Sequence, residues 1–189
     1  MAGRSFLILH GWQGNSPGHW QTWLAPRLRA AGETVAYPQL PDPDRPRPEA
    51  WLAALEAELE RLPGEPVALC HSLACLLWLH LAAARPAPGR ALLVAPPSAG
   101  AGIEELEPFF PLPASPALAS GSRLVCADDD PYCPEGAANV YAALGLPVDL
   151  VPGGGHLNTD AGYGPWPQVQ AWCLAQGASA VASSRMAPG

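Results

Sequence analysis

The hydrophobic pattern alternates between short apolar runs and longer segments with helical periodicity. Short segments with an apolar run at their centre predict six strands, at residues 4–11, 34–40, 66–72, 90–97, 122–130 and 147–154. Longer periodic segments predict five helices, at residues 19–32, 47–64, 73–86, 134–146 and 164–177. In the second of these, Trp51, Leu55, Leu59 and Leu62 form one apolar stripe, which is typical of an amphipathic helix.

Regular alternation of strands and helices predicts an α/β fold. Strands without polar alternation are typical of a parallel sheet that is covered on both faces. We therefore expect a three-layer α/β/α sandwich with a mostly or fully parallel sheet of about six strands.

The domain organisation follows from length and composition. A chain of 189 residues with 49% hydrophobic and 14% charged residues has enough apolar side chains for one globular core. We expect a single domain over residues 1–175. Residues 176–189 are small and polar, which predicts a disordered tail.

Charge and cysteine content narrow the function classes. The net charge is −7, and all ten basic residues are arginine, so nucleic acid and anionic membranes are not expected as partners. The five cysteines are odd in number and include no CxxC pair, which favours small buried hydrophobes in a reducing compartment. The longest apolar stretch, residues 73–84, is too short to span a bilayer. These features predict a cytoplasmic protein.

Polar residues that follow the predicted strands suggest a nucleophilic site. Ser72, Asp130 and His156 each come after a different strand, and the carboxyl ends of parallel strands meet at one edge of the sheet. A serine nucleophile needs a base within hydrogen-bond reach, and that base needs an acceptor to orient it. The chain order Ser, Asp, His is that of the α/β-hydrolase fold. We predict Ser72 as nucleophile, His156 as base and Asp130 as the orienting acid.

Two alternatives remain open at this point. Ser72 lies in Cys70-His71-Ser72-Leu73-Ala74 rather than in G-x-S-x-G, so the motif alone also fits a plain helix N-cap. The acid is one of three consecutive aspartates. Pro131 pushes Asp130 towards extended geometry and favours it, with Asp129 as the alternative. His10 and His19 are predicted to be structural.

The surroundings of the site can also be predicted. An oxyanion hole would come from the backbone N–H groups of Leu73 and Trp12. The segment 97–120 stands in part where a connecting helix is usual, and we expect it to fold over the site. Trp12, Phe109 and Phe110 would then form the walls of a pocket for small uncharged or aromatic acyl groups.

Several segments together resemble a known family. These are HGWQGNSPGHWQTWL (10–24), CHSLA (70–74), DDDPYCP (128–134) and GHLNTDAGYGPWP (155–167). The chain resembles, over residues 5–175, the small serine hydrolases of the retinoblastoma-binding-protein-9 and YdeN type. The resemblance implies a compact α/β-hydrolase fold without a large cap domain, and its Ser, Asp and His correspond to Ser72, Asp130 and His156.

The sequence therefore predicts a serine hydrolase that cleaves a small-molecule ester or amide by acyl transfer. No cofactor is implied, and no cluster of ligand-type residues at metal spacing is evident. The alternative is a non-catalytic binding protein on a hydrolase scaffold, with the proline-rich segment 37–51 as its partner surface.

Overall fold

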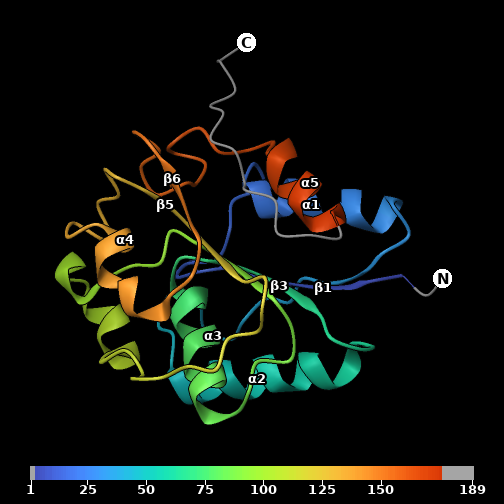
Figure 1. Cartoon of the computed structure of the whole chain (residues 1–189), viewed down its shortest axis with the longest axis horizontal. Helices are drawn as coiled ribbons and strands as arrows, with labels where there is room; N and C mark the ends of the chain where they lie inside the picture. The colour runs from blue at the N-terminus through green and yellow to red at the C-terminus, as the bar shows by residue number, and fades with distance from the viewer. Residues whose placement is uncertain (1–2, 176–189) are drawn as a thin grey trace.

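The predicted apolar runs form one sheet in the computed structural model of the chain, which describes residues 3–175 (Figure 1). The six strands lie in the order β2-β1-β3-β4-β5-β6, and every neighbouring pair is parallel. Their bounds are β1 Ser5–Leu9, β2 Thr34–Ala36, β3 Val67–His71, β4 Ala91–Val94, β5 Arg123–Ala127 and β6 Val148–Val151. The predicted fully parallel sheet is confirmed.

Helices cover both faces of the sheet, so the strands are apolar on both sides (Figure 1). Their bounds are α1 Trp20–Ala30, α2 Pro48–Arg61, α3 Leu73–Ala84, α4 Ala137–Val140 and α5 Pro167–Leu174. Successive side chains of a strand point to opposite faces. Leu7 and Leu9 of β1 accordingly join the core beneath α2 and α3, whereas Phe6 and Ile8 join the core beneath α1 and α5. The three-layer α/β/α sandwich is therefore also confirmed.

The strand order places a crevice at the end of β1. The chain moves from β1 to β2 on one side, and then crosses to β3 on the other side of β1. In open α/β sheets, ligands bind beyond the carboxyl ends of the strands at such a switch point. The loop after β1 and the start of α3 meet there, so the topology alone selects the region around Ser72.

Two segments differ from regular α/β connections. The predicted helix 134–146 is divided into the short α4 and a 3₁₀ turn at Ala142–Leu144, with Gly136 and Gly145 at positive φ on either side. Tyr141, between the two, donates its hydroxyl to Pro97 O. That bond ties this stretch to the segment after β4. Residues 97–120 hold only 3₁₀ turns, at Ala99–Ala101 and Glu104–Phe109.

The sequence predictions about the C-terminal tail, membrane-spanning helices and a cap domain concern the chain as a whole. The tail at residues 176–189 lies outside the described residues. Within residues 3–175, no helix combines the length and the apolar character needed to cross a bilayer. The same residues show no separate cap domain over the sheet.

Candidate active site

Ser72 occupies a strained turn between β3 and α3. Its φ of 55° and ψ of −125° lie outside the regions that L-residues usually adopt, which typically costs about 1–3 kcal/mol. The residue stands at the N-cap position of α3, yet its side chain makes no capping hydrogen bond. Its hydroxyl contacts His156 instead. Ser72 therefore does not cap α3 through its side chain, and a strained turn from strand to helix is the kind of backbone on which α/β-hydrolases present a serine.

The turn at Ser72 packs closely against the loop after β1. A Cβ atom on Gly11 would lie 2.7 Å from Ser72 Cβ and 3.1 Å from His71 O. The loop after β1 can approach Ser72 only because position 11 is glycine. Cys70 and Ala74, which stand where the usual motif has glycine, are fully buried.

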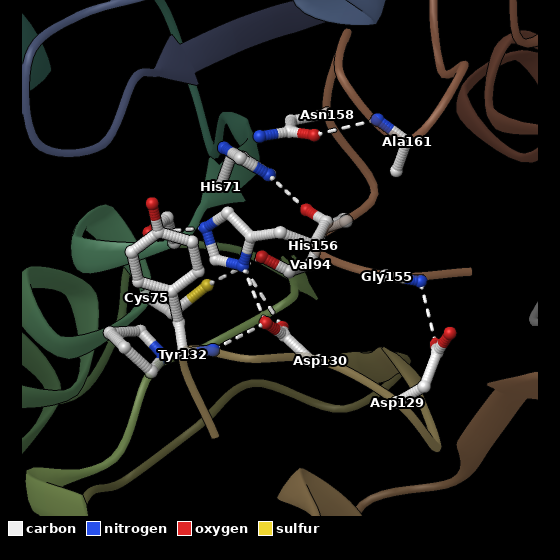
Figure 2. Close-up of polar contacts among 12 residues, drawn as sticks. His71, Cys75, Val94, Asp129, Asp130, Tyr132, Gly155, His156, Asn158 and Ala161 are labelled. Atoms are coloured by element: carbon white, nitrogen blue, oxygen red, sulfur yellow. Dashed lines mark hydrogen bonds and ion pairs between the residues drawn. The ribbon is translucent and has the colours of Figure 1, made fainter. Parts of the chain in front are cut away.

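Three side chains from three strand ends form one hydrogen-bonded chain, and Figure 2 shows the part of it between His156 and Asp130. Ser72 Oγ lies 2.9 Å from His156 Nε2, and His156 Nδ1 lies 2.9 Å from Asp130 Oδ2. A carboxylate only accepts, so Nδ1 holds the proton and Nε2 is free to accept from the serine. All three side chains are buried. The sequence prediction of which residues meet is thus matched by the geometry.

The other two aspartates contact the loop that holds His156, rather than its ring. Asp128 Oδ1 accepts from Gly153 N, and Asp129 Oδ1 accepts from Gly155 N, each at 2.7 Å. Asp130 Oδ1 also accepts from Tyr132 N at 2.9 Å, which holds the carboxylate beneath the imidazole. The choice of Asp130 over Asp129 agrees with this arrangement. The ordered roles of Asp128 and Asp129 were missed, because isolated turn carboxylates carry no sequence signal for such contacts.

Three further histidines surround His156 or the loop after β1. His10 Nδ1 donates to Gly11 O, and its Nε2 accepts from Leu40 N, so it braces the loop as predicted. His19 caps α1 by accepting from Gln21 N. His71 Nε2 donates to His156 O at 3.0 Å, and its ring centroid lies 5.0 Å from that of His156. The contact of His71 with His156 had no sequence signal, because it depends on how the loop after β6 reaches across the edge of the sheet to the end of β3.

A cavity of about 430 Å³ opens above Ser72 and His156. Its larger apolar and aromatic lining residues are Trp12, Leu106 and Tyr132, and the ring of Tyr132 lies 4.2 Å from that of His156 between centroids. The remainder is mostly polar and belongs to the loops after β1 and β6, which meet where Ser16 Oγ lies 2.6 Å from Thr159 Oγ1.

The predicted aromatic walls are only partly correct. Trp12 lines the cavity, but Phe109 and Phe110 are not among its lining residues in the described part of the chain. Phe109 is fully buried and packs edge-on against Trp51, at 5.7 Å between ring centroids. The 3₁₀ turns direct Leu106, rather than the phenylalanines, to the cavity. The segment 97–120 does reach the site, but through a different side chain.

The five cysteines are free and buried, as the composition indicated. Burial raises the pKa of Cys126 and Cys133 to about 11 and that of Cys173 to about 12. Burial also raises the pKa of Cys70 and Cys75. Since thiolates are the reactive form, these thiols are poor nucleophiles at neutral pH. Ser72 has no competing sulfur nucleophile at the site.

The buried histidines make stability depend on pH. Burial, and then the charges of His156 and His10, lower the pKa of His19 to about 3. Burial lowers the pKa of His71 well below its ordinary value of 6.5. Below pH 6.5, the two imidazoles take up protons in the unfolded chain but not in the folded chain, so acid favours unfolding. We expect the free energy of unfolding to fall by about 1.4 kcal/mol per pH unit for each of these histidines.

Urea unfolding at pH 5.5, 5.0 and 4.5 measures this slope, because the unfolded imidazoles are then almost fully protonated while His19 in the folded chain is not. His19→Asn is the matched variant, because an asparagine side chain can still cap α1 but does not titrate. It should remove one histidine's share of the slope, again about 1.4 kcal/mol per pH unit. Equal slopes in the two proteins would contradict the assignment of His19 as a buried neutral imidazole.

The fold and the site together define a class of protein. A buried Ser-His-Asp chain, contributed in that order by the ends of β3, β6 and β5 of a parallel sheet, is the arrangement of an α/β-hydrolase.

Comparison with known proteins identifies the family. The chain belongs to the serine hydrolase family, because the sequence model of that family matches residues 6–175. It is a small α/β-hydrolase of the retinoblastoma-binding-protein-9 and YdeN type.

Relatives of known sequence or structure support this placement. YdeN of Bacillus subtilis (strain 168) is 35% identical over 72 residues, an alignment that spans 38% of each chain. The solved structure of the ydeN gene product superposes with a TM-score of 0.75 at 25% identity, covering 89% of this chain and 95% of that one.

More distant structures share the fold. A YdeN-like protein of Pectobacterium atrosepticum superposes with a TM-score of 0.70 at 20% identity, covering 89% of this chain and 88% of that one. A monoacylglycerol lipase of Paleococcus ferrophilus does so with a TM-score of 0.59 at 16% identity, covering 82% and 88%.

Proposed function

We propose that the protein is an esterase-like serine hydrolase that cleaves a small, uncharged carboxylic ester or amide by acyl transfer. The observation that supports it most is the unbroken chain from Ser72 Oγ through both nitrogens of His156 to Asp130. Family membership implies a small-molecule substrate. The proposal adds the bond that is cleaved and the role of each side chain.

The reaction begins when Ser72 Oγ attacks the substrate carbonyl and His156 Nε2 takes the hydroxyl proton. The tetrahedral intermediate collapses, and His156 returns the proton to the departing alcohol or amine. A water then attacks the acyl group on Ser72 with His156 again as base, which releases the carboxylic acid. Asp130 keeps the proton on Nδ1 throughout and stabilises the imidazolium that forms in each step.

The oxyanion of the intermediate needs donors that are already in place. Leu73 is the first residue of α3, so its N–H belongs to the helix's unpaired first turn, at the positive end of the helix dipole. Trp12 follows Gly11, the residue that packs against Ser72, and would supply the second N–H. We assign the oxyanion hole to these two backbone groups.

The cavity supports an uncharged substrate. Its lining includes no arginine or lysine among the described residues, and Asp160 is its one carboxylate. An anionic substrate would find no partner there and would meet that negative charge. Trp12, Leu106 and Tyr132 offer apolar contact for a small acyl group, and most of the other lining residues are polar.

A fluorophosphonate probe tests the proposal directly, because it phosphonylates serines that are activated by a base. Folded protein should label at Ser72, as mapped by peptide mass spectrometry, and protein denatured in urea should not. Folded protein that resists labelling would exclude the serine hydrolase mechanism and would favour a non-catalytic binding protein on this scaffold.

A further inference from the structure

Beyond the last backbone pair of β5 and β6, three carboxylates that follow β5 form hydrogen bonds with the loop after β6. β5 and β6 pair up to Ala127 and Val151. Beyond that point, the next three residues after β5 are all aspartates, and each accepts a hydrogen bond from a group in residues 153–156. Figure 2 shows two of these contacts, from Asp129 to Gly155 and from Asp130 to His156.

The loop that donates to these aspartates is rich in glycine. Gly153, Gly155 and Leu157 all have positive φ, at 62°, 54° and 48°. Glycine has the largest conformational freedom to lose on folding, so the position of His156 depends on what holds the loop. Gly154 packs tightly, because a Cβ there would lie 2.8 Å from Leu157 Cδ2 and 2.9 Å from Val151 Cγ1.

Of the three aspartates, Asp129 makes the contact nearest to the base apart from Asp130. It holds the N–H of Gly155, the residue directly before His156, at 2.7 Å. On the other side, His71 holds the carbonyl of His156 itself. The backbone of the base is thus fixed before and after its Cα, by side chains from β5 and β3. Hydrogen bonds to an ionised acceptor are about twice as strong as neutral ones.

We propose that Asp129 is a positioning residue for His156. By holding Gly155 N it sets the backbone from which the imidazole reaches Ser72, in addition to the orientation that Asp130 gives to the ring. Asp129 has no contact with His156 Nδ1 and does not act as the triad acid. This inference rests on the proposed hydrolase function, and it adds a second carboxylate that the reaction requires.

The test compares two substitutions at one position. Asp129→Ala removes the acceptor, and we expect kcat for p-nitrophenyl acetate to fall by about 10- to 100-fold, because small misplacements of a catalytic group cost rates of that order. KM should stay close to that of the wild type, because Asp129 does not line the cavity. Asp129→Asn removes the charge but keeps an oxygen that can accept from Gly155 N, and it should retain most of kcat.

Two further variants serve as references. Glu60→Ala removes an exposed carboxylate from α2 and should leave both kinetic constants unchanged. Asp128→Ala removes the contact with Gly153, three residues before His156, and should lower kcat less than Asp129→Ala does. Thermal unfolding of each variant shows that the fold is retained, which is expected because the Asp128 and Asp129 side chains are exposed.

The outcomes are distinct. Wild-type kcat in Asp129→Ala would overturn the positioning role. So would an Asp129→Asn variant as impaired as Asp129→Ala, since the effect would then follow the charge rather than the hydrogen bond. A loss confined to KM would also overturn it. Wild-type protein that neither labels with the fluorophosphonate nor hydrolyses esters would instead refute the proposed function.

Discussion

Replacing Ser72 with alanine is expected to lower kcat/KM for p-nitrophenyl acetate by about 10³-fold or more, with the fold intact. The substitution removes the only atom of Ser72 that contacts His156 and leaves that base with no hydroxyl to activate. Any remaining hydrolysis would come from binding and the oxyanion hole acting on water. The Ser72 side chain does not cap α3, so its loss should not unravel the helix.

Ser98→Ala is the matched control. Ser98 is also a buried serine beyond the end of a strand, β4, but its hydroxyl donates to Glu135 Oε2 rather than to a histidine. This variant should keep most of the activity. Near-wild-type turnover in Ser72→Ala, with far-ultraviolet circular dichroism showing a folded protein, would remove Ser72 from the mechanism.

Much of the fold could be predicted because the burial of a strand determines the pattern of apolar residues in its sequence. A strand buried on both faces has few polar positions, and ALLV and the LVCA that follows Arg123 read that way from the printed chain. Parallel pairing then brings the residues after the strands to one edge, so Ser72, Asp130 and His156 could be grouped without coordinates. Their order along the chain supplied the roles.

What could not be predicted depends on the packing of irregular segments. The 3₁₀ turn of Glu104–Phe109 decides whether Leu106 or Phe109 faces the cavity. The orientation of such a turn cannot be predicted from the periodicity of hydrophobic residues. His80 of α3 adds to this, because its Nε2 donates to Phe109 O and holds the segment in place. The contacts of Asp128 and Asp129 likewise appear only once β6 lies beside β5.

Replacing Asp130 with asparagine is expected to lower kcat by about 10³- to 10⁴-fold, the scale seen when a triad histidine is held in the wrong tautomer. An amide in this place can donate to Nδ1 through its nitrogen, which would force the imidazole proton onto Nε2. His156 could then no longer accept the proton of Ser72. Burial of both partners makes the effect large, because little water is present to substitute for the lost acceptor.

Asp128→Asn and Asp129→Asn separate this effect from a general need for acidic residues after β5. Each keeps an oxygen for the backbone N–H that it holds, so each should cost far less than Asp130→Asn. The measurement is kcat for the three asparagine variants on one ester, with the same protein preparations checked for equal thermal stability. If Asp129→Asn were the severe variant and Asp130→Asn the mild one, the histidine would take its orientation from Asp129 in solution, and the acid of the triad would have to be reassigned.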